Sequence, residues 1–284
     1  MHELAMVTLD DALRDAAGRL AAAGIPEPRR EAERIWAGLT GRELGAAFLA
    51  RHDLFEPSEA IVFTEAVSRR SAGEPLAYVT GRCGFRYLDL RIDRRALIPR
   101  PETEGLVTLL LERVTTGMVA DIGTGSGCVA LSLLTEGRFR AVTAVDRSAA
   151  ALSLARENAA RVGAAPRFVL GDLTAALATG SCDALVSNPP YLTDAEHAAL
   201  DGSVRCWEPA EALVSGADGL AATRALLSDG HRVVRPGGWI ALELDANRAA
   251  ASAAIAGSQG WIDVTLARDL FGRERYLLAR RSES

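Results

Sequence analysis

The sequence predicts an α/β fold in which a small N-terminal helical bundle precedes a mostly parallel, doubly wound sheet of seven strands. Three observations predict it. Residues 1–80 carry apolar side chains at helical spacing. From Val119 onward, strand-like apolar runs alternate with helical segments, which is typical of a parallel sheet with helices on both faces. The last two strand-like segments flank Gly272 with no helix between them, so a closing antiparallel hairpin fits them.

Within residues 1–80, helix signals recur. Thr8 with Asp11 three residues on resembles a capping box for the first helix. A second helix ends at Gly41, and after a short third helix a fourth opens near Ser58. Apolar and charged residues then alternate in a linking strand or hairpin at 81–96, and residues 97–284 form the second domain.

In the second domain each element is assigned from its apolar pattern. The expected strands are Val119–Ile122, Ala141–Val145, Arg167–Leu170, Ala184–Ser187, Trp239–Leu244, Ile262–Ala267 and Arg275–Ala279. The expected helices are Val129–Leu134, Ala149–Val162, Leu220–Val233 and Ala249–Ala256.

Composition narrows the class of protein. The 284 residues are 49% apolar and 24% charged, which is ordinary for a globular chain long enough for two domains. All 32 basic residues are arginine, which excludes lysine-based chemistry such as Schiff-base formation. The cysteines and histidines are dispersed without metal-ligand spacing, so we expect no metal. No apolar run approaches the ~20 residues of a membrane span, and the acidic start lacks a signal-peptide pattern, so we expect a cytoplasmic protein.

A glycine-rich loop in the segment DIGTGSG follows the first strand of the expected sheet and precedes a helix. A doubly wound sheet binds nucleotide-like ligands there, because glycine backbone can turn sharply and approach the ligand closely. The spacing G-x-G-x-G is one residue short of the dinucleotide fingerprint G-x-G-x-x-G, which counts against a nicotinamide oxidoreductase. The candidate cofactor contacts in this loop are Gly123, Thr124, Gly125, Ser126 and Gly127.

Carboxylates end the next two strands. Asp146 lies about 20 residues beyond the loop, where an acid can accept hydrogen bonds from both ribose hydroxyls. Asp172 can accept from an adenine amine, with Leu173 packing on the ring. For each acid the alternative is a strand-end carboxylate that caps the following helix.

The fourth strand ends in the tetrad Asn188-Pro189-Pro190-Tyr191, which suits methyl transfer onto a planar, amide-like nitrogen. Such a nitrogen is a poor nucleophile because its lone pair is delocalised, so the site must supply acceptors that hold its NH₂ in line with the donor. Asn188 offers a side-chain oxygen, Pro189 a carbonyl fixed by the stiff Pro-Pro step, and Tyr191 a flat face. The alternative is a rigid turn that ends a strand.

The glycine loop, the two acids and the tetrad together indicate a pocket for S-adenosylmethionine. The sheet that carries them is then the Rossmann-like sheet of a class I methyltransferase. The sulfonium carries its own leaving group, S-adenosylhomocysteine, so neither a metal nor a covalent nucleophile is required.

With these motifs the sequence resembles the release factor glutamine methyltransferases, the PrmC/HemK family. The resemblance covers nearly the whole chain and is carried by LIPRPETE at 97–104, DIGTGSG at 121–127, AVDRSAAAL at 144–152, SNPPY at 187–191, WEPAEAL at 207–213 and DGL at 218–220. Asn-Pro-Pro-Tyr alone is shared with DNA adenine and ribosomal RNA guanine methyltransferases. The tetrad together with IPRPETE is far more specific.

The resemblance implies methylation of the side-chain amide nitrogen (N5) of glutamine in the Gly-Gly-Gln motif of peptide chain release factors. It implies that residues 1–80 dock this partner and that 97–284 form the methyltransferase domain. The implied cofactor contacts are Gly123 to Gly127, Asp146, Leu173 and Asn188. Asn188 to Tyr191 would cradle the glutamine amide, and the turn Arg100-Pro101-Glu102-Thr103 would close over the methionine end.

Two segments depart from the family pattern. Gly84-Phe85 stands where Glu-Phe is usual, and the residues from Glu243 to Arg248 stand where E-x-G-x-x-Q is usual. Both lie outside the glycine loop and the tetrad, so they bear on substrate preference rather than on chemistry.

Two other functions stay open. A nucleic-acid exocyclic-amine methyltransferase, acting on DNA adenine N6 or ribosomal RNA guanine N2, would need a basic face, whereas the net charge is −5. A non-catalytic docking protein that keeps the cofactor site would be indicated by loss of the tetrad or of Asp146, and both are present. We expect a monomer with no membrane or nucleic-acid partner.

Overall fold

The computed structural model describes residues 7–283; residues 1–6, which belong to the acidic start, and residue 284 lie outside the described residues. The chain divides into two compact units. One comprises the residues up to Arg82 with Gly202–Trp207, and the other comprises Cys83–Asp201 with the residues from Glu208 onward. Within residues 7–283, no helix is both long enough and apolar enough to cross a membrane.

The first unit is a helical bundle, as predicted. Its helices are α1 (Leu9–Ala22), α2 (Pro28–Thr40), α3 (Ala46–Leu49), α4 (Pro57–Ser71), α5 (Leu76–Thr80) and the inserted α10 (Gly202–Arg205). Thr8 caps α1 by accepting a hydrogen bond from the Asp11 N–H, and α2 ends at Gly41, which has a left-handed φ of 69°. Apolar side chains at helical spacing form the core, among them Leu13, Leu20, Ile35, Phe63 and Val67.

A short hairpin follows. Strands β1 (Arg82–Phe85) and β2 (Leu88–Arg91) pair as a two-stranded sheet. The Asn158 side chain on α8 (Ala149–Val162) accepts from the Arg91 N–H at 2.7 Å and donates to the Arg91 carbonyl at 3.0 Å. Both β2 and α8 belong to the second unit, and these two bonds hold them together.

The second unit is built on a seven-stranded sheet with the order β5-β4-β3-β6-β7-β9-β8. The strands are β3 (Thr116–Ile122), β4 (Arg138–Asp146), β5 (Arg167–Leu170), β6 (Cys182–Ser187), β7 (Val234–Glu243), β8 (Ile262–Arg268) and β9 (Glu274–Arg280). The first five are parallel, and β9 runs antiparallel between β7 and β8. The predicted fold class is confirmed.

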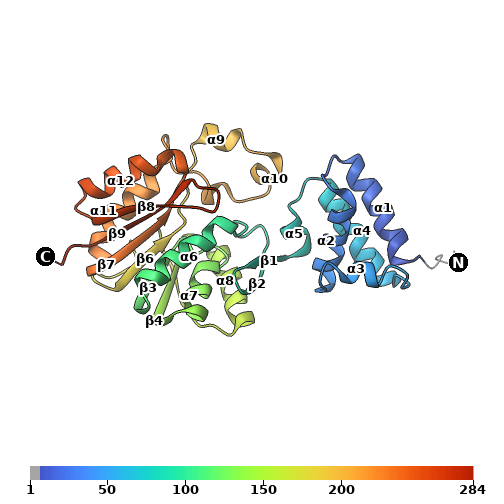
Figure 1. The fold of residues 1–284 in the computed structure, drawn as a ribbon, viewed down its shortest axis with the longest axis horizontal. Coiled ribbons are helices and arrows are strands. Elements are labelled where there is room, and N and C mark those ends of the chain that lie inside the picture. Colours follow the sequence, from blue (N-terminus) through green and yellow to red (C-terminus); the bar gives the residue numbers. More distant parts are fainter. Residues whose placement is uncertain (1–6, 284) are drawn as a thin grey trace. The chain divides into compact units, whose positions relative to one another are not determined.

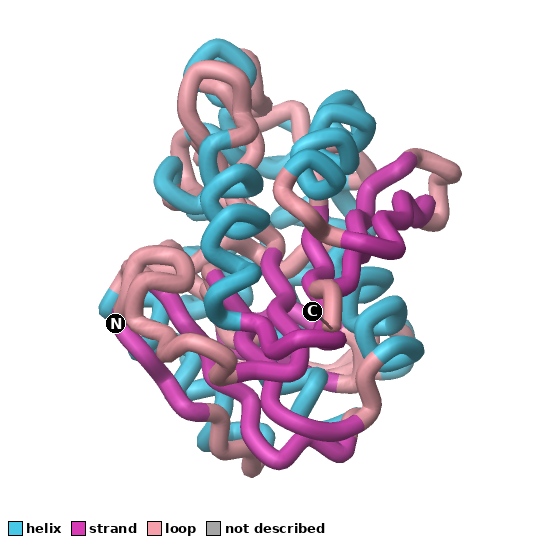
Figure 2. Tube along the Cα trace, turned by 90° about the vertical axis from the view of Figure 1, so that its left-hand side faces the viewer, coloured by secondary structure: helices cyan, strands magenta, loops and turns pink. Residues whose placement is uncertain are grey.

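Helices cover both faces of this sheet, and the strands form a twisted layer between them (Figures 1 and 2). The covering helices are α6 (Pro101–Arg113), α7 (Cys128–Glu136) and α8 on one face, and α11 (Ala221–Val233) and α12 (Ala249–Ser258) on the other. Successive residues of one strand point to opposite faces. On β3, Val119 joins the apolar core beneath α6 to α8, and Ala120 joins the core beneath α11 and α12.

The segment between β6 and α11 has little regular structure, and the sequence pattern did not predict its elements. It contains α9 (Asp194–Ala198), α10 and the 3-10 turn η1 (Ala210–Ala212). Thr193 and Glu196 form a capping box at the start of α9. Arg248, one of the departures from the family pattern, donates to the Glu196 carboxylate and to the Asp218 carbonyl, both at 2.7 Å. Arg248 thereby connects this segment to the residues that follow β7.

Candidate active site

The carboxyl ends of β3, β4, β5 and β6 meet at one edge of the sheet, where a cavity of about 400 Å³ lies. Such an edge is the usual ligand site of a doubly wound sheet. Of the predicted site residues, those that line the cavity are Gly123, Gly125, Asp146, Asp172, Leu173, Asn188 and Pro190. Those that do not line it are Thr124, Ser126, Gly127, Pro189, Tyr191, Arg100 and Pro101.

The glycine loop is supported from the strands beneath it. The N–H groups of Gly123 and Thr124 donate to the Val145 carbonyl at 2.9 and 3.0 Å. The Thr124 hydroxyl donates at 2.6 Å to the buried Asp121 carboxylate, which also accepts from the Ala130 N–H at 3.1 Å. Burial raises the pKa of Asp121 to about 7. Thr124 and Asp121 therefore hold the loop in shape.

The helix α8 fixes the other end of the loop. Gly127 has a φ of 86°, which favours glycine, and a Cβ there would lie 3.3 Å from the Ala155 Cβ on α8. The Asn158 amide on the same helix donates to the Ser126 carbonyl at 2.9 Å. Ser126 and Gly127 thus shape the loop, while Gly123 and Gly125 face the cavity.

Asp146, at the end of β4, turns both carboxylate oxygens toward backbone N–H groups. Its Oδ2 accepts from Gly125 at 2.8 Å and its Oδ1 accepts from Ser148 at 2.9 Å. A carboxylate can accept about four hydrogen bonds, so acceptor positions remain for hydroxyl groups in the cavity. These free acceptor positions fit the ribose hydroxyls of an adenosyl cofactor.

Asp172 and Leu173 follow β5 in the cavity wall. The Asp172 residue is exposed and its carboxylate is accessible to an amine. Leu173 has a φ of 47°, a left-handed conformation that costs a residue with a Cβ roughly 1–2 kcal/mol. At this strained turn the chain leaves the direction of β5, and Leu173 lies beside the cavity. An apolar side chain there fits a flat base.

Asn188 is held by a hydrogen-bonded chain from β6 to β7. Its Nδ2 donates to the Thr103 hydroxyl at 3.1 Å, and that hydroxyl donates to the Glu243 carboxylate at 2.7 Å. Because the amide nitrogen faces Thr103, the amide oxygen is turned away from it and is free to accept a hydrogen bond.

The remaining tetrad residues surround Asn188. Pro190 lines the cavity and Pro189 is buried. The Tyr191 N–H donates to the Leu213 carbonyl at 3.1 Å. Burial, with the Glu243 charge nearby, raises the pKa of the Tyr191 hydroxyl to about 12, so the side chain is neutral at physiological pH.

Arg100 and Pro101 begin α6, with Pro101 at its first turn. The Glu208 carboxylate accepts from the Arg100 guanidinium at 2.6 Å and from the Ile98 N–H at 3.0 Å. Only 1% of the Glu208 side chain is exposed. Glu208 therefore fixes the turn that was predicted to close over the methionine end.

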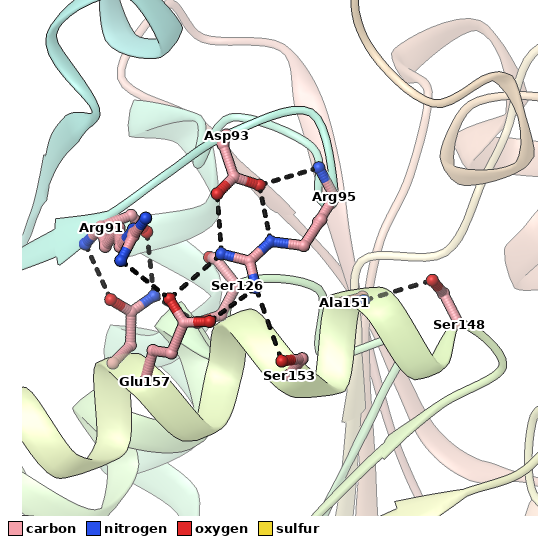
Figure 3. Close-up of polar contacts among 9 residues, drawn as sticks. Arg91, Asp93, Arg95, Ser126, Ser148, Ala151, Ser153 and Glu157 are labelled. Atoms are coloured by element: carbon pink, nitrogen blue, oxygen red, sulfur yellow. Dashed lines mark hydrogen bonds and ion pairs between the residues drawn. The ribbon is translucent and has the colours of Figure 1, made fainter.

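Arg95 contributes a further part of the cavity wall. Figure 3 shows its guanidinium between the carboxylates of Asp93 and Glu157, with bonds of 2.7 and 2.6 Å. The hydrogen bonds from these two acids raise the pKa of Arg95 above its usual range. With its charge matched in this way, Arg95 braces the wall.

The sequence prediction did not single out four polar residues that support the site, namely Asp121, Asn158, Glu208 and Glu243. Glu208 lies within WEPAEAL and Asp121 opens DIGTGSG, so a motif marks each of them. Their partners could not be inferred in the same way. Glu243 and Thr103, for example, are 140 residues apart in the chain.

Two family models match this chain. The family model described as the PrmC N-terminal domain matches residues 11–81, and that of the methyltransferase small domain matches residues 101–206. A release factor glutamine methyltransferase of Nitratidesulfovibrio vulgaris is 40% identical over 97% of this chain and 96% of its own. The enzyme of that name from Moorella thermoacetica is 42% identical over 98% of this chain and 100% of its own.

Solved structures share the fold. A methyltransferase from Pyrococcus furiosus has a TM-score of 0.54 at 19% identity, covering 77% of this chain and 99% of its own. The hMettl16 catalytic domain has a TM-score of 0.56 at 18% identity, covering 83% of this chain and 86% of its own. The near-full-length relatives identify more than the fold: the chain belongs to the family of release factor glutamine methyltransferases, which are S-adenosylmethionine-dependent enzymes.

Proposed function

We propose that this protein transfers a methyl group from S-adenosylmethionine to the side-chain amide nitrogen of glutamine in the Gly-Gly-Gln motif of release factors. The observation that carries the proposal is the orientation of Asn188. This residue lines the cavity, its amide nitrogen faces Thr103, and its amide oxygen is turned away from Thr103. An acceptor in that place suits a substrate that presents an NH₂ group. The relatives at 40% and 42% identity carry the name of this reaction.

The cofactor would lie in the cavity along the loop from Gly123 to Gly127. Asp146 would accept from the ribose hydroxyls, Asp172 from the adenine amine, and Leu173 would pack on the base. The cofactor supplies an activated methyl group and leaves as S-adenosylhomocysteine. No step of this scheme needs a metal.

The chain's contribution to the reaction is positioning. Asn188 Oδ1 and the Pro189 carbonyl would accept the two hydrogens of the glutamine NH₂, which directs the nitrogen lone pair at the methyl group. The same two acceptors stabilise the positive charge that develops on the nitrogen. Pro190 and Tyr191 would complete the cradle, and the turn with Arg100 and Pro101 would cover the methionine end. The product then loses its proton to water.

The wider organisation follows from this assignment. The helical unit, residues 1–80, would dock the release factor, and the hairpin at 81–96 would lead into the methyltransferase domain at 97–284. We propose a monomer that acts in the cytoplasm on a folded protein substrate.

Mass spectrometry of a purified release factor, incubated with this protein and S-adenosylmethionine, tests the proposal. We expect a gain of one methyl group on the glutamine of Gly-Gly-Gln, and none with Asn188→Ala at the same concentration. If the cofactor binds but the folded release factor gains no methyl group, the substrate assignment is wrong. Methylation of DNA or ribosomal RNA in a parallel reaction would then identify the nucleic-acid alternative.

A further inference from the structure

A buried carboxylate lies behind the tetrad without facing the cavity. Glu243 is the last residue of β7, and Leu242 beside it pairs with Ser187, the last residue of β6. Glu243 is 1% exposed and Thr103, in the first turn of α6, is 3% exposed. Water is therefore excluded from the contact between these two side chains, and each must be satisfied by protein groups.

The hydrogen bonds in this chain can run in one direction only while Glu243 is ionised. An ionised carboxylate has no proton to donate, so the single hydroxyl hydrogen of Thr103 must point at Glu243. Thr103 then has only lone pairs to offer Asn188, so Asn188 must present its NH₂ to Thr103. The carboxylate at one end thus decides which atom Asn188 presents at the other end.

We propose that Glu243 and Thr103 are positioning residues for methyl transfer: acting in series, they hold the Asn188 amide so that its oxygen faces the substrate nitrogen. The proposal rests on the proposed function, because the orientation matters only for a substrate that donates hydrogens. If the Asn188 amide turned by half a rotation, its NH₂ would meet the substrate NH₂, and neither group could accept from the other.

Charged and titratable groups near Glu243 lie on α6, on β9, in the turn before α6 and in the tetrad, where the Glu243 charge helps to raise the pKa of the Tyr191 hydroxyl. Arg275 on β9 and Arg100 before α6 favour its ionised form, and Glu102 on α6 opposes it. Tyr276 on β9 donates its hydroxyl hydrogen to the Glu102 carbonyl at 2.6 Å, so that hydrogen does not serve Glu243. Burial outweighs the favourable contacts and raises the pKa of Glu243 to about 7.

This balance makes the orientation depend on pH. Below the pKa of Glu243, the neutral acid can donate to the Thr103 oxygen, and the Thr103 hydroxyl is then free to donate to Asn188 Oδ1. The constraint on Asn188 is therefore present at high pH and lost as the pH falls through the pKa of Glu243.

Thr103→Val removes the hydroxyl with little change of shape, and Thr103→Ser keeps it. With release factor and S-adenosylmethionine both saturating, we expect kcat of Thr103→Val to fall roughly 10²-fold, comparable to the loss of one group that stabilises a transition state. The Kd of S-adenosylmethionine should change by less than about 3-fold, since Thr103 does not line the cavity. Thr103→Ser should recover most of kcat. Thr108→Val removes a hydroxyl from the exposed side of the same helix and serves as the matched control.

Glu243→Gln separates positioning from a merely structural role. Its amide oxygen can still accept from Thr103, but it does not titrate. We expect kcat of the wild type to fall below about pH 7 and the fall to be absent in Glu243→Gln. A Thr103→Val variant with unchanged kcat, or a Glu243→Gln variant that keeps the acid fall, would overturn the proposal.

A spectroscopic readout makes the result independent of turnover. The chain has three asparagines, Asn158, Asn188 and Asn247, so the side-chain ¹⁵N signals of asparagine-labelled protein can be assigned with Asn188→Ala. The Asn188 signal should titrate with Glu243 in the wild type and stay constant in Thr103→Val and Glu243→Gln. A titrating signal without methylation of release factor would refute only the proposed substrate, whereas a signal that does not titrate in the wild type would refute the positioning chain.

Discussion

The carboxylate of Asp146 accepts a hydrogen bond from the backbone N–H of Gly125 at 2.8 Å, which joins the end of β4 to the loop that follows β3. The loop after β3 and the acid at the end of β4 therefore form one part of the candidate ligand site. The acid that is proposed to bind ribose also fixes the loop that is proposed to lie along the cofactor.

Asp146→Ala should therefore weaken S-adenosylmethionine binding in two ways, by removing the acceptors and by releasing Gly125. We expect a loss of about 2–3 kcal/mol in binding free energy, since the remaining partners are left unpaired. Isothermal titration calorimetry measures it. Asp263→Asn, at an exposed position with a φ of 52° that asparagine tolerates, is the control and should leave Kd unchanged.

Asn188→Ala should abolish most turnover while leaving the cofactor bound. Removing an acceptor that acts on the developing charge costs on the order of 10²–10³ in kcat, whereas the contacts of Asp146 and the loop remain. Single-turnover methylation at saturating cofactor separates the two quantities. Full activity at saturation, with only a raised Kd, would place Asn188 among the binding groups alone.

Glu208→Ala should destabilise the second unit by roughly 2 kcal/mol, because Arg100 loses its partner and the Ile98 N–H is left unsatisfied. Urea unfolding followed by circular dichroism gives the change. Glu112→Ala removes an exposed partner of Arg113 on α6 and should change stability by less than about 0.5 kcal/mol. Equal effects of the two substitutions would contradict the role assigned to Glu208.

Stability should also depend on pH through Asp121. Burial raises its pKa to about 7 in the folded protein, while in the unfolded chain it ionises near its usual value of 3.8. Between these values the unfolded state loses its proton first, so the contribution of Asp121 to stability falls as the pH rises from about 4 to about 7. Asp121→Asn does not titrate. Its free energy of unfolding, relative to that of the wild type, should therefore be larger at pH 8 than at pH 5.

Much of the fold follows from local patterns. The strand Arg167–Leu170 and the helix Ala149–Val162 have the bounds that the sequence predicts, because apolar periodicity marks them. The segment from Tyr191 to Leu220 has no such periodicity. Thr193 and Glu196 form a local capping box, a sequence signal for the start of α9 that the prediction missed. The contacts of Arg248 with Glu196 and Asp218 are long-range, and no local pattern predicts them.

The candidate site, like the fold, is predicted by local patterns only in part. Glycine spacing and strand-end acids predict Gly125, Asp146 and Asn188 as neighbours because the carboxyl ends of parallel strands share one edge. The contacts of Thr103 with Glu243 and Asn188 bring α6, β6 and β7 together, and no local pattern relates these elements. The roles assigned to all of the site residues, Tyr191, Arg100 and Pro101 included, stay predictions.

The position of β9 in the sheet has a consequence for the order in which the sheet can form during synthesis. This strand, Glu274–Arg280, follows all the other described strands in the chain, yet it lies between β7 and β8 and pairs Tyr276 with Glu243. A nascent chain that ends before β9 leaves the outer edge of β7 unpaired and Glu243 uncovered. The carboxylate behind Asn188 can therefore be covered by β9 only after translation has passed Tyr276, so this part of the site is completed after the parallel strands have been synthesised.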